Sequence, residues 1–372
     1  FVSLFFLIAS IYFYLTLKKF FLKNISLLGT IIFVFHPRIF AQSFYNSKDI
    51  IFLVFFCISN FYFVNFFIRQ NLKNIFLLSI ITAITISIRP MGMIIPLLFV
   101  IFFILTNLEK YKIKNTLFII SFFFLTLSFT YLFWPYLWND PFNFINSLAT
   151  MSKFRWIGEV FFNGEYYIAK FMPWYYIPIN IISTTPFFVV ILFLVGFLAI
   201  TKKIILNLFN LNSDKENIWN NNLELFLLYS LIIIFLTIIL IVELNSTVYG
   251  GWRQIYYIYP SIVFVSVFGI KILSEKINFK KSFNALLVLL IFLNLFWMIK
   301  NHPYQYTYFN FTIKEKNLRN FELDYYGVSN LDLLKKIIQI NDKNIIKIYV
   351  FSVNPYQLSL NLLNNEDKKR IL

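Results

Sequence analysis

The chain has 372 residues, of which 59% are hydrophobic, 22% aromatic and only 13% charged, and its mean hydropathy is +0.71. Soluble domains carry about 25% charged residues, and no single soluble core of this size could bury 50 Phe side chains. The composition excludes a soluble enzyme, a disordered protein and a nucleic-acid-binding protein, and it indicates a multi-pass membrane protein. The formal charge of +16 fits this, because most of it is Lys in short loops between apolar runs.

The single cysteine, Cys57, lies inside an apolar run, which excludes an intrachain disulfide and a cysteine-based metal site. The sequence starts at Phe1, and residues 1–17 already have the composition of a membrane span. They lack the basic segment and the small-residue cleavage site of a signal peptide. We therefore expect that a preceding span and outer loop are missing from this sequence.

Ten apolar runs are long enough to cross, or nearly cross, a bilayer. They cover residues 1–17, 25–36, 50–68, 75–88, 93–108, 116–138, 187–201, 225–243, 261–274 and 283–299. With alternate loops on alternate sides, one set of loops carries 15 Lys and Arg residues and the other, longer set carries 7. The positive-inside rule makes the first set cytoplasmic. The second set, with loops at 37–49, 89–92, 139–186 and 244–260, faces outward, which is the periplasm if the membrane is a bacterial inner membrane.

The tail from Lys300 to Leu372 has the composition of a water-soluble unit, with 11 basic and 7 acidic residues. Ser329–Asn341 is predicted to be a helix with Ser329 as its N-cap, and the alternation over Ile345–Phe351 predicts a strand. The predicted fold is thus an all-α polytopic membrane domain over residues 1–299, followed by a small α/β extracytoplasmic domain over residues 300–372.

The acidic residue with the most suggestive position is Asp49, which stands where an outer loop meets the next span. No predicted span carries an ionisable residue near its middle, which argues against an ion-coupled carrier. A carboxylate held at the outer boundary could instead orient or deprotonate an acceptor hydroxyl. Capping of the helix that starts at Ile50 is the alternative interpretation.

Four basic residues at the outer boundary are candidate ligands of a phosphate group: Arg38, Lys48, Arg89 and Arg253. A guanidinium group binds phosphate oxygens through two parallel hydrogen bonds, as an enzyme with a lipid-phosphate donor requires. Snorkelling of these side chains to the membrane surface is the alternative.

Candidate contacts to an acceptor or a sugar lie in the two longest outer loops. They are Trp138, Asp140, Tyr249 and Trp252. Aromatic rings in such loops either lie among lipid headgroups or stack on sugar rings. His36 and His302 have no second ligand at metal spacing, so the residues themselves predict no zinc site.

Four segments together resemble the GT-C glycosyltransferases of family 39 type, which include the protein O-mannosyltransferases and the lipid A aminoarabinose transferases. They are Pro37–Ala41 with Asn46–Asp49, Ile88–Pro90, Tyr249–Gln254 with Pro260, and His302–Tyr304 with Tyr308–Asn310 and Phe321–Gly327. The first and last segments resemble a bacterial subgroup with the patterns PRxFAxSFYNxKD and FExDYWGxS, in which Tyr326 replaces the Trp.

The resemblance implies transfer of a sugar from a polyprenyl-phosphate donor to a hydroxyl of a protein, lipid or glycan, at the outer membrane face and with inversion at the anomeric carbon. It implies a catalytic base in the family's first outer loop, which would precede Phe1. Asp49 matches the acid of the second loop on the catalytic face, and Arg89 and Arg253 fall where phosphate-binding residues are expected. Some members of the fold use a divalent cation, so the resemblance leaves a metal cofactor open.

The alternative function is a flippase, polymerase or ligase for lipid-linked oligosaccharides, because these proteins are also polytopic and also carry outer Arg and aromatic residues. A flippase needs a cationic cavity among its helices, whereas the predicted spans are uncharged. A structural or assembly subunit is the third interpretation. An Asp or Glu pair in a loop just before Phe1 would favour the enzyme.

Overall fold

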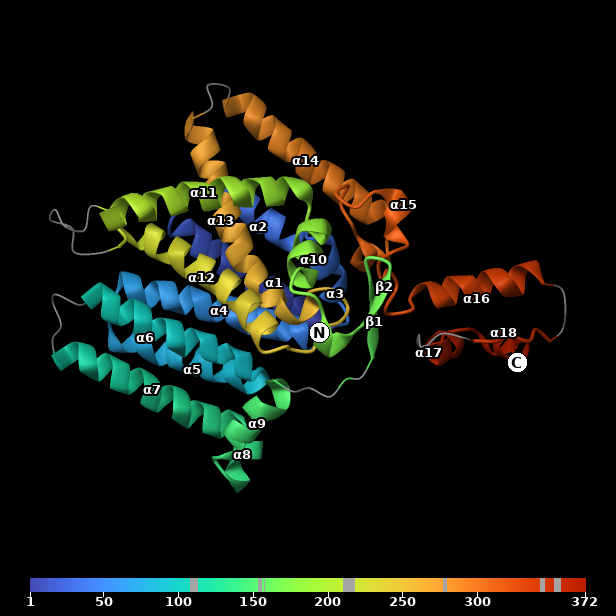
Figure 1. Ribbon diagram of the computed structural model, residues 1–372, viewed down its shortest axis with the longest axis horizontal. Helices are drawn as coiled ribbons and strands as arrows, with labels where there is room; N and C mark the ends of the chain where they lie inside the picture. The colour runs from blue at the N-terminus through green and yellow to red at the C-terminus, as the bar shows by residue number, and fades with distance from the viewer. Residues whose placement is uncertain are drawn as a thin grey trace.

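The computed structural model describes residues 1–107, 113–152, 156, 158–209, 218–276, 280–341, 345–350 and 356–372. Its main body is a bundle of apolar helices, and the last three helices stand apart from it (Figure 1). Each of the ten predicted spans is a helix. The ten are α1 (Val2–Lys18), α2 (Lys23–Val34), α4 (Asp49–Ile68), α5 (Leu72–Ile88), α6 (Ile94–Asn107) after the 3-10 turn η1 (Pro90–Met93), α7 (Ile113–Phe133), α11 (Phe187–Phe209), α12 (Asn222–Glu243), α13 (Tyr259–Lys276) after the 3-10 turn η3 (Arg253–Ile258), and α14 (Lys280–Lys300).

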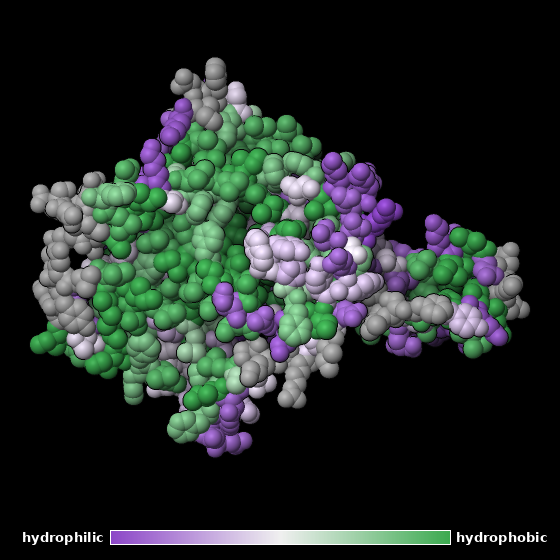
Figure 2. All heavy atoms as spheres, in the orientation of Figure 1, coloured by the Kyte–Doolittle hydropathy of each residue, from purple (hydrophilic) through white to green (hydrophobic). Residues whose placement is uncertain are grey.

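Seven helices in the described part of the chain are long and apolar enough to cross a bilayer, while α1, α2 and α5 are apolar but shorter. The predicted all-α polytopic class is confirmed. Helix α13 with η3 is central, since 89% of its most apolar window is buried, whereas α7, α11 and α14 keep only 17 to 22% buried. Their exposed apolar side chains make most of the bundle surface hydrophobic, as a lipid-facing surface must be (Figure 2).

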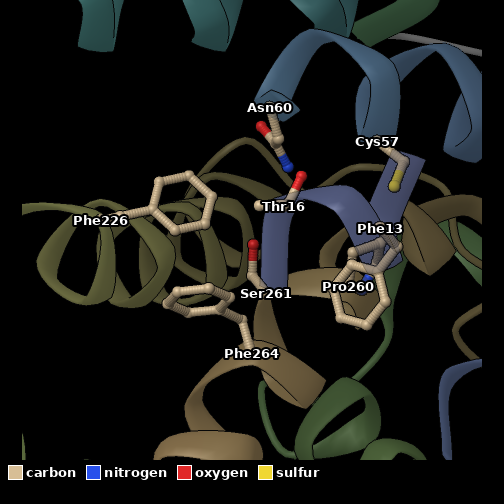
Figure 3. Close-up of a pocket in the computed structure, with 8 residues that line it drawn as sticks. All are labelled: Phe13, Thr16, Cys57, Asn60, Phe226, Pro260, Ser261 and Phe264. Carbon is tan, nitrogen blue, oxygen red and sulfur yellow. The ribbon is translucent and has the colours of Figure 1, made fainter. Parts of the chain in front are cut away.

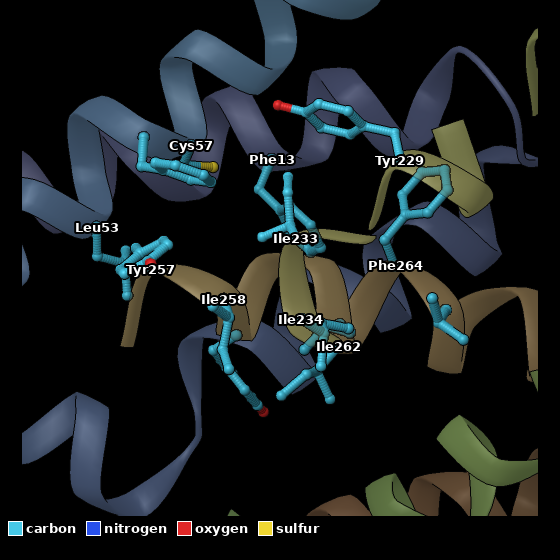
Figure 4. Packing of buried hydrophobic residues seen from close by; sticks show 14 of the residues in the cluster. Phe13, Leu53, Cys57, Tyr229, Ile233, Ile234, Tyr257, Ile258, Ile262 and Phe264 are labelled. Carbon is cyan, nitrogen blue, oxygen red and sulfur yellow. The ribbon is translucent and has the colours of Figure 1, made fainter. Parts of the chain in front are cut away.

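The central helix packs closely because glycines face each other across its contact with α11. A Cβ on Gly196 would lie 2.1 Å from the carbonyl oxygen of Val265, and a Cβ on Gly269 would lie 2.1 Å from that of Leu192. Small residues of this kind let two membrane helices approach backbone to backbone. On the other side of α13, aromatic and branched side chains of α4 and α12 fill the core, among them Leu53, Tyr229 and Ile233 (Figure 4). Phe63 of α4 stacks on Tyr229 of α12 at 4.1 Å between ring centroids.

The loops predicted to face outward fold into short elements. They are α3 (Pro37–Gln42), α8 (Tyr136–Asn139), α9 (Asn143–Ser152), the antiparallel hairpin of β1 (Glu159–Phe162) and β2 (Glu165–Ile168), the 3-10 turn η2 (Ala169–Phe171), α10 (Tyr176–Thr184), the 3-10 turn η4 (Gln305–Thr307) and α15 (Glu315–Leu318). The hairpin, α3 and α10 lie at one end of the bundle, and the C-terminal ends of α6 and α11 lie at the opposite end (Figure 1). The long outer loop is therefore partly folded, and its hairpin pairs with the tail.

The tail has two parts with different packing. Residues up to Gly327 pack on the bundle, since Phe321 belongs to its core and Asn310 donates to the carbonyls of Ile182 and Thr185, each at 2.7 Å. The helices that follow share a small core of their own. Of these helices, α16 (Ser329–Ile340) and α17 (Tyr356–Asn361) contribute side chains to this core, and α18 (Asn365–Lys369) follows them near the end of the chain.

Two local predictions for the tail are wrong. The N-cap of α16 is Val328 and not Ser329, because the Asp324 carboxylate already accepts the Val328 and Ser329 amides and the Ser329 hydroxyl. In place of the predicted strand, the described residues show one isolated bridge between Ile346 and Ile371, and Phe351 lies outside the described residues. A short apolar alternation with one partner strand cannot build a sheet, so the tail helices supply most of this core.

Candidate active site

Five segments that are far apart in the sequence meet at one end of the bundle, the end predicted to face outward, which is named the outer end. They are α3, the start of α4, the turn before η1, the turn before η3 and the tail segment 321–327. Apolar packing brings them together, since η3 lies against α4 and η4 lies against α3. The tail is held here by two backbone hydrogen bonds to the hairpin, from Glu322 to Phe161 at 3.1 Å and from Gly164 to Asn320 at 2.9 Å.

Asp49 and Arg89 form a buried ion pair, which unites the predicted acid with one of the predicted phosphate ligands. Each residue is 6% exposed. Asn46 donates to the second carboxylate oxygen of Asp49 at 2.8 Å, and Arg89 Nη1 donates to the carbonyl of Gln254 at 3.0 Å. A desolvated pair of this kind fixes geometry, because removing either partner leaves an uncompensated charge. The carboxylate is thus held by side chains and caps no helix.

Gln42 connects this pair to the tail. Its side-chain amide donates to the hydroxyls of Tyr256 at 3.2 Å and Tyr325 at 2.8 Å, and its carbonyl oxygen accepts from Asn46 at 2.5 Å. Gln42 is completely buried, and a buried amide is stable only when it is hydrogen-bonded in this way. One network therefore runs from Arg89 through Asp49, Asn46 and Gln42 to the tail tyrosine.

Among the three arginines of this site, Arg253 has the most open guanidinium, since it is only partly buried whereas Arg38 and Arg89 are buried. Its Nη1 donates to the hydroxyl of Tyr326 at 2.7 Å, and its plane lies over the ring of Tyr249 at 4.7 Å. Among the described residues, its Nε has no hydrogen-bond partner. The side chain is oriented by aromatic rings, and donors remain for an anionic group.

The Gly250–Gly251 turn separates Arg253 from Arg38. Both glycines have left-handed backbones, with φ of +62° and +73°. A Cβ on Gly250 would lie 3.1 Å from Nε of Arg253, and a Cβ on Gly251 would lie 3.2 Å from Nη1 of Arg38. Arg38 is 2% exposed, donates from Nε to the Tyr308 carbonyl at 2.9 Å, and has no partner for Nη2 within the described chain. Two cations thus flank a turn that only glycine accommodates.

Two acidic groups of the tail border this site and differ in their electrostatics. Burial raises the pKa of Glu322, and the opposing influence of Arg253, Arg38 and the Gly250 amide does not cancel that rise. Burial also acts to raise the pKa of Asp324, but hydrogen bonds from Ser329, Tyr306 and the Val328 amide outweigh it and hold this pKa below its usual value. Asp324 is therefore a firmly ionised acceptor, whereas Glu322 is the more easily protonated carboxyl.

The remaining predicted residues have different positions. Trp252 is completely buried and donates from its indole to Thr184 at 2.8 Å, so its ring packs within the protein. Lys48 is exposed at the start of α4. Trp138 and Asp140 are also exposed but belong to the α8 region, which lies away from η3 and the tail in Figure 1. Tyr249 alone among the predicted aromatic contacts touches a predicted phosphate ligand.

Sequence reasoning assigned no role to Gln42, Glu322, Asp324, Tyr325 or Tyr326, which the structure brings to the same place. The available signal was the segment Phe321–Gly327, whose mixture of acids, tyrosines and glycine is unusual after so many apolar runs. His36 is fully buried against the rings of Trp252 and Tyr259, and its Nδ1 accepts from the Ile39 amide at 3.3 Å as the N-cap of α3. It is therefore a structural residue that starts α3.

One cavity, of about 10 Å³, lies away from this site in the membrane core, among Phe13, Cys57, Asn60 and Ser261, and its volume is roughly the smallest that holds one water molecule. Figure 3 shows its lining. Another, of about 20 Å³, lies near the turn before η3 and is lined in part by Tyr176 and Val248. In the described residues, no group of three or more His, Cys, Asp or Glu side chains is placed to hold a metal ion.

Comparison with known proteins gives one match. A family model described as dolichyl-phosphate-mannose-protein mannosyltransferase matches residues 1–134. No curated protein and no solved structure matches the chain. The matched segment contains Gln42, Asp49 and Arg89, and it ends before Arg253 and the tail. The match confirms the resemblance to the GT-C glycosyltransferases and supports a membrane glycosyltransferase that uses a lipid-linked sugar donor.

Proposed function

We propose that this membrane glycosyltransferase transfers a sugar from a polyprenyl-phosphate donor to an acceptor hydroxyl at the outer face of the membrane. One observation carries the proposal. The Nε of Arg253 has no hydrogen-bond partner among the described residues, and a second, buried cation, Arg38, stands behind the same glycine turn. A polyprenyl chain can stay in the lipid while its phosphate reaches this boundary. Guanidinium groups in a desolvated setting suit a phosphate better than they suit a neutral ligand.

In the proposed reaction, the acceptor oxygen bonds to the anomeric carbon, and the bond from that carbon to the phosphate oxygen breaks. The electron pair stays on the phosphate, so negative charge grows on the leaving group. Arg253 donates hydrogen bonds to that phosphate, and Arg38 adds positive potential from behind the turn. A fixed cation aimed at the developing charge lowers the barrier without reorganisation.

In this proposal, Asp49 and Arg89 act as an ion pair and not as two separate ligands of the substrate. Because they neutralise each other, Arg89 is the less suitable phosphate ligand, and Arg253 takes that role. We predict that Asp49 acts on the acceptor side through Asn46 and Gln42, whose hydrogen bonds extend from its carboxylate toward the tail. The acceptor proton goes to the base that the resemblance assigns to the family's first outer loop.

The test is binding of polyprenyl phosphate, a probe that needs no knowledge of the sugar, to the purified protein in detergent. Hydrogen bonds to charged groups contribute about 1.5–3 kcal/mol, so Arg253→Ala should weaken binding by about 10- to 100-fold. Arg253→Lys should lose less affinity, since charge remains but the bidentate geometry does not. Arg319→Ala, which removes an exposed arginine of the tail, is the matched control.

Polyprenol, which has the same chain but no phosphate, should bind equally to all variants. Unchanged affinity of folded Arg253→Ala for polyprenyl phosphate would refute the proposal. Full affinity in Arg253→Lys would instead mark Arg253 as a snorkelling residue whose charge alone matters.

A further inference from the structure

The tail segment Asp324–Gly327 is held on the outer face of the bundle by aromatic packing and by hydrogen bonds. Directly before it, Phe321 packs on the rings of Phe162 and Phe309, with centroids 5.5 and 5.3 Å away. Gly327 closes the segment with φ of +64°, and its amide donates to the carbonyl of Asp324 at 3.1 Å. The segment is thus a tight turn whose entry is packed into the core.

One carboxylate organises this turn. Asp324 accepts hydrogen bonds from the amides of Val328 and Ser329, both at 3.0 Å, and from the hydroxyls of Ser329 and Tyr306. Tyr306 belongs to η4 and is completely buried. Four donors on one carboxylate exceed what capping of α16 requires, and the bond to Tyr306 ties the turn to the bundle.

The turn places two tyrosines on the site. The ring of Tyr306 lies edge-on to those of Tyr325 and Tyr326, with both centroids 5.6 Å away. From there, the Tyr325 hydroxyl accepts from Gln42 at 2.8 Å and the Tyr326 hydroxyl accepts from Arg253 at 2.7 Å. Asp324 and Tyr306 therefore set where both hydroxyls stand.

We propose that the turn Asp324–Gly327 is a positioning element of the donor site, with Asp324 as a positioning residue that acts through Tyr326 on Arg253. The proposal rests on the proposed function, because it takes the Arg253 guanidinium as the phosphate ligand. Its ligand class is the phosphate group of a polyprenyl phosphate.

The chemistry of a guanidinium explains why such an element is needed. Arg253 has five N–H donors in a rigid plane, so the orientation of that plane decides which two of them face the same phosphate. Stacking on Tyr249 fixes the plane, but it leaves the plane free to rotate on the ring face. The bond from Nη1 to Tyr326 removes that rotation, so the remaining donors keep a constant direction.

The experiment compares Tyr326→Phe, Asp324→Asn and the double variant in the full chain, with polyprenyl phosphate as the probe. Tyr326→Phe keeps the ring but loses the hydroxyl, and it should weaken binding by about tenfold, the effect of one hydrogen bond to a charged group. Asp324→Asn should weaken binding by a similar factor. The double variant should be no weaker than Tyr326→Phe alone, because both changes release the same guanidinium.

Asp332→Asn is the matched control, since Asp332 is also a tail carboxylate that accepts from a tyrosine, Tyr304, but among the described residues it makes no hydrogen bond or ion pair with Arg253 or its tyrosines. Asp332→Asn should bind polyprenyl phosphate with the affinity of the unchanged chain. If the fold losses in affinity of the two single variants multiply in the double variant, or if Asp332→Asn loses as much affinity as Asp324→Asn, then Asp324 only stabilises the tail and the proposal is overturned. Normal binding by Tyr326→Phe, with Arg253→Ala still impaired, would also overturn it and leave the donor site intact. Normal binding by Arg253→Ala would refute the proposed function itself.

Discussion

The ion pair between Asp49 and Arg89 yields a stability prediction whose size follows from its surroundings. Both side chains are only 7% exposed, so removing one partner leaves the other charged and desolvated. Breaking a buried pair in this way costs about 3–5 kcal/mol. The loss in free energy of unfolding for Arg89→Gln should be near the upper end of this range, because among the described residues Asp49 then keeps only Asn46 as a side-chain partner. Asp49→Asn should lie near the lower end, because Arg89 keeps its bond to the Gln254 carbonyl.

The chain provides its own reporter for this measurement. Cys57, its single cysteine, is 1% exposed in α4, the helix that begins at Asp49, so a thiol-reactive fluorogenic maleimide will detect unfolding on heating. Each single variant should lower the midpoint temperature clearly. The double variant Asp49→Asn with Arg89→Gln should lose less than the sum, by up to about 3 kcal/mol, since neither charge remains buried.

The control is the pair of Lys203 and Glu224 at the opposite end of the bundle, where the lysine side chain is 50% exposed and the nitrogen-to-oxygen distance is 3.6 Å. Lys203→Gln should cost at most about 1 kcal/mol. If Arg89→Gln shifts the midpoint no more than Lys203→Gln does, or if the two site variants simply add, the pair does not hold the outer end together.

Three further predictions follow from the same region. Because the pKa of Glu322 is raised, the folded state favours the protonated acid, and this contribution to stability is lost as the pH rises from about 4.3 through the raised pKa. Glu322→Gln should therefore raise the midpoint temperature of unfolding at pH 7.5. The difference in midpoint between this variant and the original chain should shrink toward pH 4.5. Gly251→Ala and Gly164→Ala both force alanine into a left-handed backbone, but only Gly251 adjoins a guanidinium, so only Gly251→Ala should weaken polyprenyl phosphate binding, and equal binding by both variants would contradict the role of the turn. In a Cys57→Ser background, Asn163→Cys in the hairpin turn should react with an impermeant thiol reagent applied from outside and Lys73→Cys should not, and the reverse pattern would invert the topology.

The helices could be predicted from the sequence because a membrane span depends on local composition alone. An apolar run of sufficient length must form a helix in lipid to satisfy its backbone, whatever it packs against. Segments outside the membrane are subject to no such rule. The hairpin of β1 and β2 and the cap of α16 depend on neighbours such as Asn320 and Asp324, so composition did not predict the hairpin and the local sequence pattern placed the cap at Ser329.

The site residues illustrate the same difference. Position at a membrane boundary singled out Asp49, Arg89, Arg38 and Arg253, and all four lie at the outer end of the bundle. Position could not show that Arg89, 40 residues away in the sequence, neutralises Asp49, nor that Trp252 is enclosed while its neighbour Arg253 is not. Pairing is a property of the tertiary fold, and it decides which cations are left to bind a phosphate.

The hydrogen-bond network also bears on how the family match relates to the site. The match ends at residue 134, yet two matched polar groups of the network have partners beyond it: Arg89 bonds to Gln254, and Gln42 bonds to Tyr256 and Tyr325. A change in the tail can therefore reach Asp49 through Gln42 and Asn46 without disturbing any helix. Since these groups are buried and each has its hydrogen-bonding capacity largely used, displacement of one partner leaves the next unsatisfied. It follows that the matched helices are not sufficient for a working site, and that the outer face is assembled only when the turn before η3 and the tail segment 321–327 have docked on α3 and α4.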